Sequence, residues 1–171
     1  MKRQAVFLIL IGLIWMGCST SAQKGYKIEK DSRGNSFAVG TIGEKDLLQV
    51  FPKFNANYES YSPDSAAVSF LHTFAKPVQI LIVLGTWCPD SQHEVGRFLK
   101  AFDEAKNDSI SVKMIAVNRS KDARGGIRKR YGIERVPTFI VYYRNKEMGR
   151  IIEHPKTTVE GDLVEILKAI R

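Results

Sequence analysis

One cysteine, flanked by tryptophan and proline in the stretch GTWCPDSQHE (residues 85–94), is the residue in this sequence best suited to chemistry. Cys88 follows the apolar run Val78–Leu84, and Pro89 is typical of the first position of a helix. We therefore predict that Cys88 lies at a helix N-terminus, where unpaired N–H groups and the helix dipole stabilise an anion. Because the thiolate is the nucleophilic form of cysteine, this position favours thiol chemistry.

Ser91 stands one helical turn after Cys88, where a two-cysteine site would carry its second thiol. Its hydroxyl is expected to add a hydrogen bond to the sulfur, and we predict Cys88 and Ser91 as the catalytic residues. Trp87 is expected to shield one side of the thiol and to offer a flat apolar surface to a partner. A serine hydroxyl does not displace sulfur at neutral pH. The site alone should therefore not complete the reduction of a disulfide.

Alternating strands and helices must position this turn. The apolar runs Val78–Leu84 and Ser111–Val117 are typical of strands buried on both faces. Further elements are predicted by period, caps and turn residues. They are a weak strand at 35–42, helices at 44–51, 62–74, 89–102, 124–131 and from Thr157, a loop at 55–61, and a hairpin of 138–143 with 148–153. This order predicts an α/β fold, with a central sheet flanked by helices on both faces.

Two separate motifs, in the same order along the chain, carry a resemblance to a known family. The turn Trp87-Cys88-Pro89-Asp90-Ser91 is similar to the Trp-Cys-x-x-Cys turn of thioredoxins, as a monothiol variant. The segment YGIERVPT (131–138) resembles the segment that carries the family's cis-proline. The resemblance implies a thioredoxin-like fold with a mixed central sheet.

The family resemblance also implies roles for the residues around the cysteine. Pro137 would be cis and face Cys88, whereas a strand-opening proline is the alternative for that position. The Val136 backbone would pair with an extended substrate. The implied substrate-binding residues are Trp87, Pro89, Val136, Pro137 and Thr138.

Three positions depart from the thioredoxin pattern. Ser91 replaces the resolving cysteine, and Ile82 stands where many thioredoxins carry a buried aspartate. Gly96 stands where the family often has a helix-kinking proline, and we expect it to leave the helix straighter or looser. His93 and Glu94 are expected to be exposed helix residues.

The first residues are typical of an export signal. Lys2 and Arg3 precede the apolar run 5–16, which is shorter than the ~20 residues of a membrane span and typical of a secretory signal peptide. Trp15-Met16-Gly17-Cys18 resembles the lipobox of bacterial lipoproteins, although Trp15 replaces the usual aliphatic residue. The resemblance implies a lipid on Cys18 and a membrane-anchored protein of the cell envelope facing the periplasm, with the outer membrane favoured by Ser19. The predicted organisation is a signal peptide at 1–17, a tether at 18–34 and a thioredoxin-like domain at 35–171.

Composition narrows the classes of function. The chain has 171 residues and a formal charge of +8, with 44% hydrophobic residues, as in a globular protein. Basic residues gather between Arg119 and Arg135, which indicates either an anionic partner or a solvated helix face, and we favour the latter because no nucleic-acid motif accompanies them. His72 and His154 have no metal-ligand spacing, and we predict no metal and no cofactor.

These observations favour an exported monothiol thiol–disulfide oxidoreductase that forms mixed disulfides through Cys88 and needs an external thiol for resolution. Its expected partners are protein thiols and disulfides, low-molecular thiols, and the membrane through the lipid, and we expect a monomer that binds no nucleic acid. The alternative is a redox-inert thioredoxin-fold module that binds extended client peptides. An iron–sulfur-binding relative of monothiol glutaredoxins is disfavoured, because the Cys-Gly-Phe-Ser turn is missing.

Overall fold

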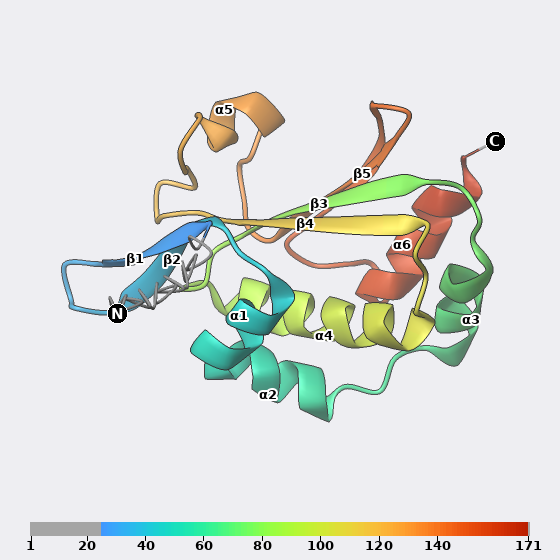
Figure 1. Cartoon of the computed structure of the whole chain (residues 1–171), viewed down its shortest axis with the longest axis horizontal. Coiled ribbons are helices and arrows are strands. Elements are labelled where there is room, and N and C mark those ends of the chain that lie inside the picture. Colours follow the sequence, from blue (N-terminus) through green and yellow to red (C-terminus); the bar gives the residue numbers. More distant parts are fainter. Residues whose placement is uncertain (1–24, 171) are drawn as a thin grey trace, which may run out of the picture.

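The backbone of the computed structural model, which describes residues 25–170, is organised around one mixed sheet of six strands (Figure 1). The strand order is β1-β2-β4-β3-β5-β6, with β3 and β4 parallel and every other pair antiparallel. The strands are β1 (Tyr26–Lys30), β2 (Ser36–Thr41), β3 (Val78–Leu84), β4 (Ile110–Ala116), β5 (Thr138–Tyr143) and β6 (Lys146–Ile152). The predicted mixed sheet is confirmed.

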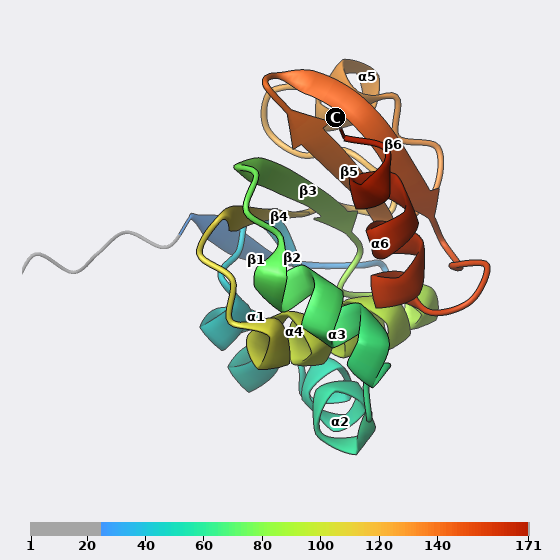
Figure 2. The ribbon, with the colours of Figure 1, turned by 90° about the vertical axis from the view of Figure 1, so that its right-hand side faces the viewer.

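Helices cover the two faces of this sheet unequally. They are α1 (Glu44–Val50), α2 (Pro52–Ser60), α3 (Ser65–Thr73), α4 (Pro89–Ala105), α5 (Ile127–Tyr131) and α6 (Val159–Lys168). All but α5 gather on one side of the sheet, and the short α5 lies on the other (Figure 2). Helices therefore flank both faces, as predicted, but between residues 25 and 170 one face has only the five helical residues of α5 above it.

Strand β3 is central because it has apolar side chains for both faces. Ile80, Ile82 and Leu84 are fully buried in the cluster beneath α4 and α6. Leu81 and Val83 point to a second, smaller cluster on the α5 side, and that cluster also contains Cys88. Both apolar clusters, one on each face of the sheet, therefore contain side chains of β3, the strand that leads directly into the Trp-Cys turn.

The folded part of the chain begins earlier than the predicted boundary at residue 35. β1 lies within the predicted tether (18–34) and pairs antiparallel with β2 along its whole length, from Tyr26 opposite Gly40 to Lys30 opposite Ser36. A turn closes this hairpin because Asp31 Oδ1 accepts hydrogen bonds from the backbone N–H groups of Arg33 and Asn35, both at 2.9 Å. The tether prediction is wrong from Tyr26 onward, since local carboxylate-to-backbone bonds make residues 31–35 a turn.

The segment predicted as a loop at 55–61 is mostly helix. Pro52 occupies the first turn of α2, and Phe54 is fully buried against the core. Few apolar residues follow, so the segment has no clear helical period. Tertiary packing of one aromatic residue against α4 decides its structure.

Two helix caps differ from the predicted ones by one or two residues. Asp64, not Ser62, caps α3 by accepting a hydrogen bond from Ala67 N–H, and Thr158, not Thr157, caps α6 by accepting from Gly161 N–H. Glu160 is fully buried rather than part of a capping box. Its Oε1 accepts hydrogen bonds from the Tyr61 hydroxyl at 2.8 Å and the Asp64 N–H at 3.0 Å. The N-terminus of α6 is thereby tied to the linker between α2 and α3.

The contact between α1 and α4 makes stability depend on pH. Burial, together with the neighbouring Asp103, raises the pKa of Glu44 from 4.5 to about 7. The folded chain then binds more protons than the unfolded chain between these values. This contribution to stability is full below about pH 4.5 and is lost as pH rises towards 7, to the extent of about 1 kcal/mol for this partly exposed group.

We therefore predict that Glu44→Gln flattens the pH dependence of thermal unfolding. Between pH 5 and pH 8 the unfolding midpoint of the unaltered chain should fall by a further ~2–4 °C relative to this variant. Calorimetry at a series of pH values measures the difference. Glu59→Gln, which removes an exposed acid from α2, is the control and should keep the original profile. Identical profiles for Glu44→Gln and the unaltered chain would contradict the prediction.

Candidate functional site

The chain turns from β3 into α4 through Gly85–Cys88, and this turn carries the predicted reactive group. Cys88 is the residue that precedes α4, and Pro89 is the first residue of that helix, as predicted. The Cys88 N–H donates to the Gly85 carbonyl at 2.9 Å, and the Cys88 carbonyl accepts from Gln92 N–H at 3.0 Å. The sulfur therefore sits at the positive end of a 17-residue helix, with 8% of the residue exposed.

The peptide bond between Val136 and Pro137 is cis, which confirms the conformation that the family resemblance implies. This bond lies against the cysteine, because the Cys88 thiol donates a hydrogen bond to the Val136 carbonyl oxygen at 3.3 Å. Thr138 is buried and its hydroxyl donates to the Arg135 carbonyl at 2.7 Å, which closes the bend before β5. The two motifs found in the sequence thus meet where β3 ends and β5 begins.

Ser91 has a different contact from the one predicted. Its side chain is fully buried, and Oγ accepts a hydrogen bond from the Gly85 N–H at 3.1 Å, where a bond to the sulfur was expected. The reason is the turn itself, because Gly85 has just left β3 and its N–H needs a buried acceptor. Ser91 therefore fixes the backbone that carries Cys88.

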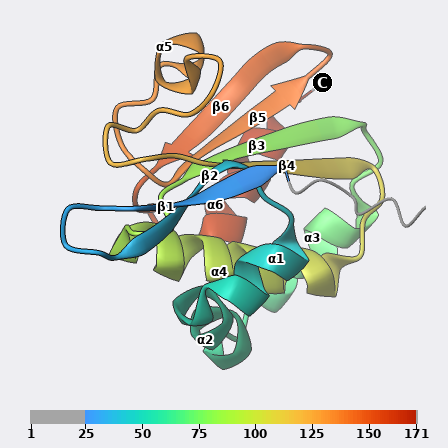
Figure 3. The ribbon, with the colours of Figure 1, turned by 60° about the vertical axis from the view of Figure 1, so that its left-hand side comes forward.

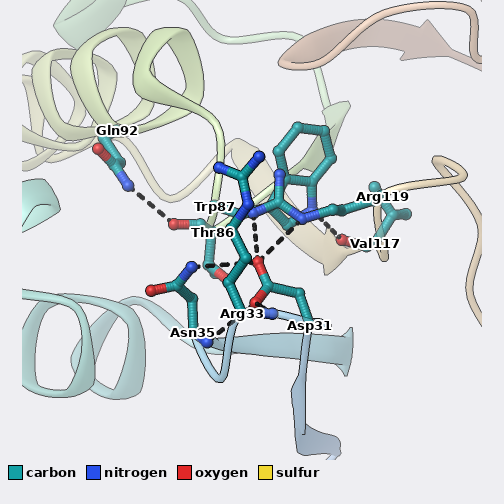
Figure 4. A network of polar contacts seen from close by, with 8 residues as sticks. All are labelled: Asp31, Arg33, Asn35, Thr86, Trp87, Gln92, Val117 and Arg119. Atoms are coloured by element: carbon teal, nitrogen blue, oxygen red, sulfur yellow. Dashed lines mark hydrogen bonds and ion pairs between the residues drawn. The ribbon is translucent and has the colours of Figure 1, made fainter.

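Two polar residues that fix the turn, one in it and one in α4, had not been identified from the sequence. Thr86 is buried, and its Oγ1 accepts a hydrogen bond from Ala38 N–H in β2 at 2.9 Å. The Gln92 side-chain amide donates to the Thr86 carbonyl at 2.9 Å, as Figure 4 shows. The signal for Thr86 was present, since a polar residue directly after an apolar strand needs a partner. Nothing local identifies Ala38 as that partner, 48 residues away.

Trp87 is held from two sides. Its indole Nε1 donates to the Val117 carbonyl at 3.0 Å, and the Arg119 guanidinium lies 5.1 Å from the ring centroid (Figure 4). Gly85 is needed beneath the ring, because a Cβ there would lie 2.8 Å from Trp87 Cε2. The indole is thus a fixed wall beside Cys88.

Arg119 connects this tryptophan to the turn between β1 and β2. Its Nη2 lies 2.6 Å from Asp31 Oδ2, and its Nε donates to the same oxygen at 3.2 Å (Figure 4). The Arg119 guanidinium, helped by the backbone N–H groups of the turn, holds the pKa of the Asp31 carboxyl well below its usual range. Arg119 had been seen only as one of a run of basic residues, and Asp31 as part of a tether.

A shallow groove runs along α4 next to Pro89. The α2 residues Lys53, Ala56 and Asn57 line one side of it, and Asp90, His93 and Glu94 line the other. Glu94 is buried, which corrects the expectation that it is exposed, and its Oε1 lies 2.7 Å from His93 Nδ1.

In the part of the chain that the structure describes, no three His, Cys, Asp or Glu residues are grouped so that they would hold a metal ion.

The other departures from the thioredoxin pattern also have physical reasons. Gly96 permits α2 to pack closely on α4, because a Cβ at this position would lie 2.6 Å from the Phe54 carbonyl oxygen. The helix is continuous through it from Pro89 to Ala105. Ile82 is fully buried in the apolar cluster of the sheet and pairs with Phe139 of β5.

We predict that Arg119→Gln loosens Trp87 with little loss of stability. In a chain that begins at Ser19, Trp87 is the sole tryptophan. Its emission should shift to longer wavelength and its quenching by acrylamide should increase, because the cation and the tie to Asp31 are gone. The free energy of unfolding should fall by only about 1 kcal/mol, since Arg119 is half exposed.

The matched control is Arg97→Gln, which removes an arginine stacked over Tyr61 at 4.9 Å and should leave the Trp87 signal unchanged. Asp31→Asn should reproduce the effect of Arg119→Gln. An unchanged spectrum in both variants would show that the ion pair does not hold the ring.

Comparisons with known proteins agree with this geometry. A family model described as Thioredoxin matches residues 49–167. The fold is similar to that of a protein of unknown function (PA1234) from Pseudomonas aeruginosa, with 20% identity, a TM-score of 0.53, and coverage of 74% of this chain and 86% of that one. An HIV epitope-scaffold is also similar, with 20% identity, a TM-score of 0.56, and coverage of 75% and 88%. None of the curated protein sequences compared with this chain matches it. Since the family model matches well over half of the sequence, and the sheet and the cis-proline turn agree with it, the chain belongs to the thioredoxin family.

Proposed function

We propose that this chain exchanges thiols and disulfides through the single thiol of Cys88. The observation that carries the proposal is the position of that sulfur, at the N-terminus of α4 and 3.3 Å from the carbonyl oxygen that precedes cis-Pro137. A helix N-terminus favours the thiolate, and Cys88 is the free cysteine in the described part of the chain.

The reaction begins with loss of the thiol proton to solvent. The Cys88 thiolate attacks one sulfur of a client disulfide, so that a Cys88–client disulfide forms and the client's own disulfide breaks. The displaced client sulfur leaves as a thiolate and takes up a proton. A low-molecular thiolate, or a second thiol of the client, then attacks the client sulfur of the mixed disulfide and releases Cys88. The steps are thiol–disulfide exchanges and need no further oxidant or reductant.

Resolution by an outside thiol follows from Ser91. A serine hydroxyl is not ionised at neutral pH and does not displace sulfur, and its oxygen already accepts the Gly85 N–H. We assign Ser91 the role of a positioning residue, which differs from the catalytic role expected from the sequence. Trp87, Pro89, Val136, Pro137 and Thr138 remain the proposed contacts for a client.

We also propose a cell-envelope location. The signal peptide at 1–17 and the lipid at Cys18 lie outside the described residues and stay predictions from sequence, as do the periplasmic orientation and the monomeric state. Between residues 25 and 170 the structure has no helix long and apolar enough to span a membrane. The proposed partners are client proteins with thiols or disulfides, low-molecular thiols, and the membrane through the lipid.

A single-turnover experiment tests the exchange. The chain that begins at Ser19 is reduced, freed of reductant and mixed with a peptide dimer joined by one disulfide, so that the displaced peptide thiol diffuses away, and the products are identified by intact mass. We predict a covalent adduct of chain and peptide at Cys88, which added glutathione then releases. Cys88→Ser should form no adduct.

Substitutions at position 91 provide the matched comparison. Ser91→Cys should release the fully reduced peptide without glutathione and lose two hydrogens to a disulfide between Cys88 and the introduced cysteine, because side chains one helical turn apart share a face. Ser91→Ala should stop at the adduct, as the unaltered chain does. If the unaltered chain forms no adduct while Cys88→Ser still binds reduced client peptides, the redox-inert binding module is the correct function.

A further inference from the structure

A basic groove lies on the face of the sheet that α5 only partly covers. Strands β1, β2 and β4 form its floor and α5 its wall, on the side of the molecule that Figure 3 brings forward. Four cations line it, and they come from three different parts of the chain: Lys27, Lys113, Arg124 and Arg130. Among the described residues that line it, Glu29 is the one acid.

These four cations are available to a ligand. All four are exposed. Within residues 25–170, none of them takes part in an ion pair with a carboxylate, in contrast to Arg119, Arg135 and Arg150. Arg130 lies 5.3 Å from the ring centroid of its neighbour Tyr131, a contact that leaves the guanidinium edge free to donate hydrogen bonds.

The groove lies in the most basic part of the described chain. Between Ile110 and Arg135 only Asp122 and Glu134 are acidic, against the following basic residues: Lys113, Arg119, Lys121, Arg124, Arg128, Lys129, Arg130 and Arg135. The helices α1 and α2, on the opposite side of the sheet, carry Glu44, Asp46 and Glu59 against Lys45 and Lys53. The α5 face is therefore positive relative to the other face. Lys27 and Lys113 come from strands, so the cluster is more than the solvated helix face predicted from sequence.

The groove lies beside the first described residues and shares residues with the apolar cluster that contains Cys88. Gly25 and Tyr26, the first two residues that the structure describes, line it. Ile115 and Ile127 also line it, and both belong to the apolar cluster that contains Cys88. A surface bound here would lie on the same face of the sheet as that cluster.

We propose that this groove docks on an anionic phospholipid surface, with a headgroup phosphate held among Lys27, Lys113, Arg124 and Arg130. Lysine and arginine beside a membrane are attracted to anionic headgroups, and the attraction grows with each cation. The charge argument does not depend on the proposed thiol chemistry. The proposed lipid at Cys18 would keep the groove close to the membrane, because the seven peptide bonds from Cys18 to Gly25 span at most ~25 Å.

Vesicle binding tests the proposal with the chain that begins at Ser19, which retains the whole described sheet and core. Vesicles of phosphatidylcholine, with or without phosphatidylglycerol, are sedimented with the chain. We expect binding only to the anionic vesicles. The variant with Lys27, Lys113, Arg124 and Arg130 all replaced by Gln should bind at least ~10-fold more weakly.

The control variant replaces four exposed lysines elsewhere, Lys45, Lys53, Lys146 and Lys156, with Gln, and so has the same net charge. It should keep the affinity of the unaltered chain. Equal loss in both variants would overturn the proposal in favour of attraction by net charge alone. Tighter binding to a DNA duplex than to anionic vesicles would also overturn it, in favour of a nucleic-acid site. Thermal unfolding and mixed-disulfide formation should be unchanged in both variants, which separates a failure of docking from a failure of the thiol chemistry.

Discussion

The site depends on one constraint, which is that a chain leaving a buried strand must find partners for its backbone polar groups before it can begin a helix. Here the Gly85 N–H is accepted by Ser91 Oγ, and the Thr86 carbonyl by the Gln92 amide. A buried N–H without an acceptor costs ~1–3 kcal/mol, so these bonds define a single path for the turn. Cys88 is held at the N-terminus of α4 because these two hydrogen bonds fix the backbone between β3 and the helix.

Elements outside the family match supply part of this support. The match begins at residue 49, whereas β1, β2 and most of α1 precede it. Thr86 is bound to β2 through Ala38 N–H, and Trp87 is bound to the β1–β2 turn through Arg119 and Asp31. The hairpin thus adds two contacts to the reactive turn. On the other side of α4, α2 packs against Gly96.

The sequence predicted what depends on local period and local caps. The strand Val78–Leu84, the helix start at Pro89 and the cis conformation of Pro137 all agree with the structure, because an apolar run and two family motifs identify them. Three predictions were wrong: a tether where β1 lies, a loop where most of α2 lies, and the Cys88 sulfur as the partner of Ser91. Each of these is decided by a contact that is not visible in its own segment, such as the pairing of β1 with β2 or the burial of Phe54 against α4.

We propose that this fold activates Cys88 while Ser91 holds the turn beneath it. The most direct measurement is the alkylation rate of Cys88 as a function of pH, in the chain that begins at Ser19 and therefore has one thiol, folded and in denaturant. Rates are normalised to a free model thiol under each condition. We expect faster alkylation of the folded chain near neutral pH. Slower alkylation of the folded chain across the whole pH range would contradict it and would mark Cys88 as a structural thiol.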